Sequence, residues 1–196
     1  MGELYLHNLD KFKCKVFIET GTGKGTGLKH ALQFNFEKLF SIEINEHLYQ
    51  ECRFKFNLPR VNLVNASSIE GLKKILPTIS KEDKILFWLD AHFPGADFQL
   101  GSYDDPIDLN LKLPLRKEIE VICDYRKNCK DTFIIDDLQL FEEGNYELNQ
   151  PESFLLKYRT SNQFIYDLFG DSHSFTKDYR HQGFLILRPK DEINIP

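Results

Sequence analysis

The sequence lacks several features that would point to particular classes of protein. Its four cysteines include no CxxC pair and no spacing typical of a zinc site, so we expect reduced thiols. It has neither an apolar N-terminal segment nor a stretch of 18 apolar residues, so we expect a cytoplasmic protein with no membrane partner. It has no lysine- and arginine-rich run, and its net charge is −5, so nucleic acid is not an expected partner.

What the sequence does contain suits one globular domain. A chain of 196 residues, of which 41% are hydrophobic, is long enough to bury one core and short for two. No internal repeat, low-complexity tract or linker interrupts it. We therefore predict a single domain over residues 1–196.

Apolar runs alternate with amphipathic segments along the chain, a pattern typical of a parallel sheet with helices between its strands. The expected strands are 15–19, 39–43, 61–65, 84–90 and 132–136, followed by a hairpin of 174–179 and 183–188. The expected helices are 26–36, 46–57, 67–79, about 12 residues from Leu115, and 152–168. The pattern predicts an α/β fold with a doubly wound, Rossmann-like, mostly parallel sheet and a C-terminal antiparallel hairpin.

A glycine-rich turn follows the first expected strand. Gly21, Gly23 and Gly25 come directly after Glu19 and Thr20, and glycines suit a backbone that takes unusual φ values or lets a ligand approach closely. The spacing fails both the G-x-x-x-x-G-K-S/T loop and the third glycine of the G-x-G-x-x-G dinucleotide pattern. A glycine-rich loop without a ligand is the alternative interpretation.

A second acid, Glu43, ends the next expected strand. A carboxylate at that position can accept hydrogen bonds from both hydroxyls of a ribose, although a strand-end acid is also often a helix cap. The third strand is followed by Ala66 and Ser67, which lie near the same edge of the predicted sheet.

Together these residues resemble class I S-adenosylmethionine (SAM)-dependent methyltransferases, whose E/D-x-G-x-G-x-G motif is matched by Glu19 and the glycines. The resemblance implies that SAM is the cofactor. The glycines would pack under its methionine part, Glu19 would orient its amino group and Glu43 would bind its ribose. The complete predicted cofactor site is Glu19, Thr20, Gly21, Gly23, Gly25, Glu43, Ile44, Ala66, Ser67 and Asp90.

Carboxylates end two further strands, because Asp90 closes the fourth and Asp136 and Asp137 close the fifth. The carboxyl ends of parallel strands meet at one edge of a sheet, so we expect these three side chains to gather there. Clustered carboxylates repel one another unless a cation or raised pKa values relieve them, and oxygen ligands suit Mg²⁺. We therefore predict a Mg²⁺ site at Asp90, Asp136 and Asp137. The alternative is a set of unrelated strand-end acids, with Asp137 capping the next turn.

This arrangement is similar to that of metal-dependent O-methyltransferases of small molecules, such as catechol and macrolide or aminocoumarin sugar O-methyltransferases. In the sugar enzymes, the residue two positions after the first metal-binding Asp is the proposed general base, and here that position is His92. The resemblance implies methyl transfer to a hydroxyl of a small acceptor, with Asp90 and His92 as the catalytic residues. A histidine of near-neutral pKa is a suitable proton acceptor for this reaction.

Other functions remain open at this stage. The alternatives are a metal-free methyltransferase acting on another nucleophile, a non-catalytic module with the same fold, and a metal hydrolase built on Asp90 and His92.

The segment 91–114 has prolines, glycines and no clear period, so we expect a lid over the acceptor or a contact within a homodimer. The remaining predictions concern histidines: His7 and His30 are expected at the surface, and either His173 or His181 could reach the cleft.

Overall fold

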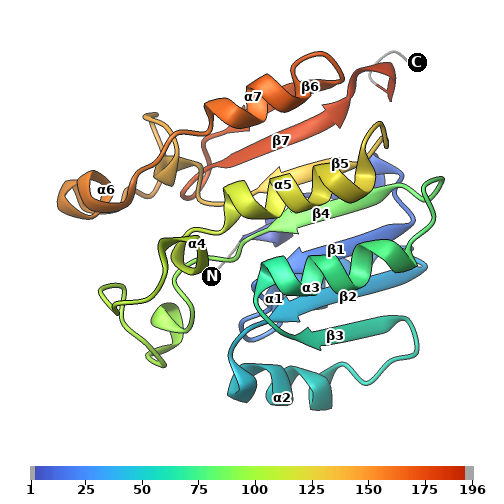
Figure 1. Cartoon of the computed structure of the whole chain (residues 1–196), viewed down its shortest axis with the longest axis horizontal. Helices are drawn as coiled ribbons and strands as arrows, with labels where there is room; N and C mark the ends of the chain where they lie inside the picture. Colours follow the sequence, from blue (N-terminus) through green and yellow to red (C-terminus); the bar gives the residue numbers. More distant parts are fainter. Residues whose placement is uncertain (1–2, 193–196) are drawn as a thin grey trace.

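The computed structural model describes residues 3–192, which form a seven-stranded sheet (Figure 1). Its strand order is β3-β2-β1-β4-β5-β7-β6. Strands β1 to β5 are parallel to one another, whereas β7 is antiparallel to both β5 and β6. The bounds are β1 (Val16–Thr20), β2 (Lys38–Glu43), β3 (Val61–Asn65), β4 (Ile85–Leu89), β5 (Thr132–Ile135), β6 (His173–Asp178) and β7 (Phe184–Pro189). The predicted fold class is confirmed.

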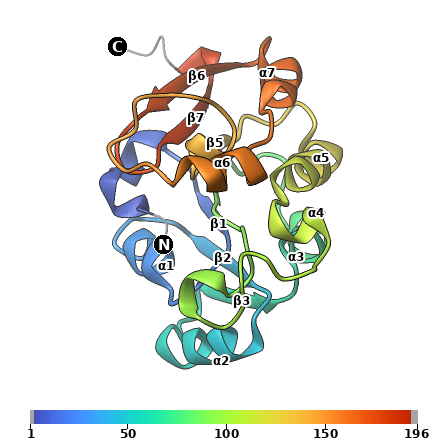
Figure 2. The same ribbon diagram turned by 90° about the vertical axis from the view of Figure 1, so that its left-hand side faces the viewer.

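Helices cover both faces of the sheet (Figure 2). One face is covered by α3 (Ser68–Ile75), α5 (Leu115–Arg126) and α7 (Gln163–Phe169). The other is covered by α1 (Thr26–Ala31), α2 (Glu46–Lys55) and two short 3-10 turns, η1 (Leu4–Leu6) and η2 (Leu9–Phe12). Two further helices, α4 (Leu109–Lys112) and α6 (Glu152–Tyr158), lie beyond the carboxyl ends of the strands, on the left of Figure 1.

Alternate side chains along each strand build a separate hydrophobic core on each face. Ile18 and Phe87 pack into the core beneath α3 and α5, whereas Phe17 and Trp88 pack into the one beneath α1, η1 and η2. Both faces of the central strands are therefore buried, which explains why their sequences are almost continuously apolar. No helix in the described part of the chain is both long and apolar enough to cross a membrane.

The helix predicted as about 12 residues from Leu115 is confirmed as α5, whereas two others are shorter than predicted, for identifiable reasons. The helix expected over 26–36 ends at Ala31, where the Arg60 guanidinium binds the carbonyl groups of the residues that follow. The helix expected over 67–79 ends as α3 and continues as a 3-10 turn that contains Pro77, which cannot donate a backbone hydrogen bond.

The helix expected over 152–168 is wrong, because the structure has two helices there, α6 and α7. Between them, the backbone turns away to pair with the segment after β5: Thr160 N donates to the Leu140 carbonyl at 2.8 Å. The placement of His7 at the surface is wrong as well. Its ring is 2% exposed and packs edge-on against Phe184, so it belongs to the core.

Candidate cofactor and cation site

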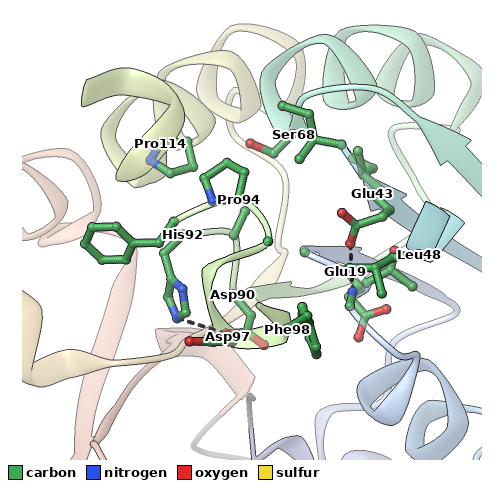
Figure 3. A pocket seen from close by; sticks show the side chains of 18 of the residues that line it. Glu19, Glu43, Leu48, Ser68, Asp90, His92, Pro94, Asp97, Phe98 and Pro114 are labelled. Atoms are coloured by element: carbon green, nitrogen blue, oxygen red, sulfur yellow. Dashed lines mark hydrogen bonds and ion pairs between the residues drawn. The ribbon is translucent and has the colours of Figure 1, made fainter. Parts of the chain in front are cut away.

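A cavity opens at the carboxyl ends of β1, β2 and β4 (Figure 3). The chain leaves β1 and β4 toward opposite faces of the sheet, and α/β sheets bind their ligands at such a switch point. The predicted cofactor residues that line the cavity are Glu19, Gly21, Gly23, Glu43, Ile44, Ser67 and Asp90.

Three predicted cofactor residues are not part of the cavity lining: Thr20, Gly25 and Ala66. Thr20 is fully buried within β1. Gly25 is the N-cap of α1 at φ 79°, and a Cβ there would lie 2.3 Å from the ring of Phe56. Gly25 therefore shapes the turn rather than facing the cavity.

Glu19 lies beneath the glycine turn and is 1% exposed. Its carboxylate accepts a hydrogen bond from the Ser41 hydroxyl, which in turn lies 2.6 Å from the Thr22 hydroxyl. Burial raises the pKa of Glu19 to about 8, because desolvation outweighs the stabilising bond from Ser41. Glu19 is therefore a largely neutral acid at pH 7, and it supports the turn from below.

Gly27 is a functional position that sequence analysis missed. A Cβ on this residue would lie 2.1 Å from Oε1 of Glu19, so a side chain at position 27 would displace the carboxyl group of the buried acid. The signal was present as a fourth glycine in the turn, but the motif pattern stops at Gly25.

Glu43 connects the glycine turn to β2. Its Oε2 accepts a hydrogen bond from the backbone N of Gly23, and its Oε1 accepts one from that of Asn45, each at 2.8 Å. The side chain that caps α2 is Asn45, which accepts from the backbone of His47 and Leu48. Glu43 is therefore not a helix cap, and its carboxylate lies at the cavity wall (Figure 3). Burial raises its pKa despite the two backbone bonds.

Asp90, Asp136 and Asp137 gather at the ends of β4 and β5, and His92 lies among them. One ligand atom from each of Asp90, His92 and Asp137 lies within 4.8 Å of the other two. His92 Nε2 forms an ion pair with Asp137 and lies 3.7 Å from Asp90 Oδ1. Asp136, which was predicted as a ligand, is not a member of this close group; it is 5% exposed and lies beside Asp90.

Burial and crowding shift the pKa values of this group. Burial alone would lower the pKa of His92, but attraction to Asp137 and Asp90 raises it to about 10. Burial raises the pKa of Asp90 to about 6, and it raises the pKa of Asp136 well above its usual value, with Asp90 and Asp137 adding repulsion. With no cation bound, a charged imidazolium therefore lies where a cation would neutralise Asp90 and Asp137.

A smaller cavity behind this group is lined by Glu118 of α5, which sequence analysis did not identify. Glu118 is 1% exposed, and burial raises its pKa to about 7. Asp90 Oδ1, Asp136 Oδ1 and Glu118 Oε1 accept no hydrogen bond from any residue that the structure describes. Buried carboxylate oxygens without donors are costly and call for a cation or protons. The available signal was a charged residue on the apolar face of an expected helix.

The position of Asp137 is set by the tip of the β6–β7 hairpin. Asp137 has φ 51° and precedes a 3-10 turn, η5 (Leu138–Leu140). Within that turn, fully buried Gln139 donates from Nε2 to Gln182 Oε1 at 2.7 Å and accepts from the backbone N of Gln150 at 2.8 Å. The backbone N of Leu138 also donates to the Gly183 carbonyl at 2.9 Å. The segment at Gln150 and the tip of the β6–β7 hairpin thus fix the turn that carries Asp137.

The two histidines of the hairpin have separate locations. His173 Nε2 lies 2.9 Å from the Asp131 carbonyl, at the end of the sheet opposite the cavity, so it does not reach the cleft. His181 lies at the hairpin tip, where its Nε2 is 3.4 Å from Glu3 Oε1. Neither lines the large cavity or the small one behind it.

No protein-family model matches the sequence, and no curated protein matches it either. Solved structures do share its architecture. A Staphylococcus aureus protein described as a caffeoyl-CoA O-methyltransferase is 14% identical, with a TM-score of 0.63 over 96% of this chain and 84% of its own. The O-methyltransferase from Bacillus cereus, solved with S-adenosylhomocysteine (SAH), is 14% identical, with a TM-score of 0.56 over 95% of this chain and 79% of its own.

Spermidine synthase from Thermotoga maritima has the same fold, at 15% identity and a TM-score of 0.53 over 95% of this chain and 58% of its own. Identities this low establish architecture and leave activity to be argued from the site. The strand order, the glycine turn after β1 and these structural neighbours agree: the chain has the class I methyltransferase fold.

Proposed function

We propose that this chain is a SAM-dependent methyltransferase that acts on a hydroxyl of a small acceptor, such as a sugar or natural product. One observation carries the proposal: Glu43, the glycine turn and Asp90 line a single cavity. Glu43, which suits a ribose, and Asp90, which belongs to the cation group, are therefore close enough for a methyl donor and its acceptor to meet in the cavity. The Bacillus cereus neighbour, solved with SAH, supports the choice of cofactor.

The cofactor end of the cavity offers suitable partners for SAM. Glu43 has lone pairs left for the ribose hydroxyls after its bonds to the backbone of Gly23 and Asn45. Gly21 lies against the backbone that follows β4, since a Cβ on it would lie 2.7 Å from the Asp90 carbonyl oxygen. Ser67 and Ile44 line the walls on the adenine side. Glu19 acts through the turn that it supports.

The other end offers a donor set for a divalent cation. The oxygens of Asp90 and Asp137 suit Mg²⁺ or Mn²⁺, with His92 beside the cation as a base and not as its ligand. A bound cation would lower the pKa of an acceptor hydroxyl. With Asp90 and Asp137 neutralised in this way, His92 no longer needs to be charged and can accept the hydroxyl proton as the methyl group leaves the sulfonium.

A second candidate is metal-free transfer to an amine. The fold is shared with spermidine synthase, so it is not restricted to methyl transfer to oxygen. In this case Asp90 and Asp137 would bind an ammonium group of the acceptor, in the place that the His92 imidazolium takes in the free protein.

Calorimetric titration tests the cofactor. SAM and SAH should bind and raise the melting temperature, whereas NAD and ATP should do neither. Absence of heat and of a thermal shift at about millimolar SAM would contradict the proposal. SAH release in the presence of hydroxylated or amine acceptors, with Mg²⁺ or with a chelator, then decides the chemistry. Transfer to hydroxyls that chelation leaves intact would exclude the cation, and transfer to amines alone would favour the second candidate.

A further inference from the structure

Part of the segment between β4 and α5 forms one wall of the cofactor cavity. Pro94, Gly95 and Phe98 all line it, facing the glycine turn that follows β1. Figure 3 shows Phe98 on the side of the cavity away from Ser68 and Pro114, close to Asp90. The segment was expected to form a lid over the acceptor or a contact within a homodimer, and these three residues lie at the end of the cavity that we propose for the cofactor.

The Phe98 ring packs directly on the glycine turn. A Cβ on Gly23 would lie 2.6 Å from Cζ of Phe98, and the Lys24 ammonium lies 5.6 Å from the ring centroid. Gly23 is the residue whose backbone N is bound by Glu43. Among the described residues, Phe98 belongs to none of the three buried hydrophobic clusters. Its contacts therefore point to a role at the cavity and not in the core.

The turn that carries Phe98 is closed on itself. The backbone N of Phe98 and that of Leu100 both donate to the Gly95 carbonyl, at 3.1 and 3.0 Å. Gly95 and Gln99, on either side of η4 (Ala96–Phe98), have φ values of 76° and 60°. Residues 95–100 thus form a compact unit with a left-handed residue at each end of the 3-10 turn, where backbone rotation can move the unit as a whole.

The base of this unit is anchored to α6. The Tyr103 hydroxyl donates to Asp97, and Lys112 Nζ donates to the Tyr103 carbonyl at 2.9 Å. Phe93 packs against Tyr103 and against Tyr158 of α6, with ring centroids 5.2 and 4.9 Å apart. The anchor holds Phe98 over the glycine turn, so the position of the ring depends on the Asp97–Tyr103 bond.

We propose that Phe98 is a cofactor-contacting residue, and that the 95–100 turn lifts from the glycine turn to admit SAM and to release its product. This rests on the proposed function. A ring that covers the entrance slows both arrival and departure of the ligand, and contact with the bound ligand slows departure further. Removing the ring therefore accelerates both steps, dissociation more than association.

The test measures association and dissociation of SAH by surface plasmon resonance on the full chain. Phe98→Ala should raise the dissociation rate constant at least about tenfold and the association rate constant about threefold. Tyr103→Phe keeps the aromatic ring and removes only the bond to Asp97, so dissociation should rise about threefold. Leu100→Ala is the matched control on the same turn, because Leu100 is 45% exposed and does not line the cavity.

The outcomes separate this inference from the function that it rests on. If the unaltered chain does not bind SAH, the cofactor assignment fails. If it binds SAH and Phe98→Ala leaves dissociation within twofold of normal, the cofactor stands and the role of Phe98 is overturned. An equal rise in both rate constants, with unchanged affinity, would also overturn it, since the ring would then block the entrance without touching the ligand. Melting temperatures of all three variants show whether each one is folded.

Discussion

In the glycine-turn half of the site, Glu43 holds the backbone of Gly23 and Ser41 holds Glu19, so the acids are bonded by their own surroundings. In the carboxylate half, Asp90 and Asp136 each leave one buried oxygen without a donor among residues 3–192. In the first half the acids therefore have hydrogen-bond donors from the protein itself. The second is balanced only by protons and the His92 imidazolium, and this is the state that a cation would replace.

Asp137→Asn should weaken cation binding in the carboxylate half of the site, and this is the largest change that we expect. Loss of one anionic ligand from a partly buried group should lower Mn²⁺ affinity about 1000-fold, which is about 4 kcal/mol. Electron paramagnetic resonance of bound Mn²⁺ measures this. Asp124→Asn, at an exposed position of α5, is the control. Equal Mn²⁺ affinity in Asp137→Asn and the unaltered chain would show that no cation binds between Asp90 and Asp137.

Glu19→Gln tests whether the Glu19 carboxyl group is uncharged and supports the glycine turn in that form. The folded-state pKa of Glu19 is raised to about 8 from 4.5, so its contribution to stability is complete below pH 4.5 and is lost as the pH rises through 8. The amide that replaces this carboxyl group does not titrate. At pH 8 the variant should therefore exceed the original chain in free energy of unfolding by on the order of 3 kcal/mol, and the gain should vanish near pH 4.5.

Chemical denaturation at a series of pH values measures this difference, and SAH affinity provides a second readout. Because the Glu19 carboxylate is bonded to Ser41 beneath the turn, SAH affinity should stay within about threefold of normal. A loss of affinity as large as that expected for Glu43→Ala would show that Glu19 binds the amino group of the cofactor directly.

Glu43→Ala tests the glycine-turn half of the site without changing the carboxylate half. Removal of the ribose contacts should lower SAH affinity by about 2 kcal/mol, or about 30-fold, while Mn²⁺ affinity stays unchanged. Calorimetric titration of both ligands gives the two values. Glu46→Ala is the control, since Glu46 is exposed in the first turn of α2. A fall in Mn²⁺ affinity in Glu43→Ala would mean that the two halves are coupled.

The two halves also differ in how far the sequence predicts them. Glu43 and the glycines lie within one β-turn-α unit and its neighbour, so their spacing indicates their geometry. The cation group was predicted as Asp90, Asp136 and Asp137, but its close group contains His92 in place of Asp136. Adjacent residues after a strand point in different directions, and which of them faces the cavity depends on the turn that follows.

That turn is held by residues remote in sequence. Gln139, Gln150 and Gln182 come from three separate segments, and glutamines in turns carry no pattern that would pair them. Glu118 was missed for a related reason, because its role depends on where α5 crosses the ends of β4 and β5. Short-range spacing thus predicted the fold class and brought Glu43 and the glycine turn to one cavity, whereas the arrangement of the carboxylate half required the tertiary structure.

Gln182→Leu tests this dependence and should have the smallest effect. Gln182 Oε1 accepts from the side chains of Gln139 and Gln150, at 2.7 and 3.0 Å, and its backbone carbonyl accepts from Gln139 N at 3.2 Å. The substitution removes only the side-chain bonds, so it should cost about 1 kcal/mol in free energy of unfolding. Because the Asp137 turn loosens with Gln139, Mn²⁺ affinity should fall about threefold while SAH affinity is unchanged. Gln163→Leu, which removes a bond to Asp167 between two exposed positions of α7, is the control for a lost surface hydrogen bond. If both variants lose stability and neither loses Mn²⁺ affinity, the hairpin supports the fold without positioning Asp137.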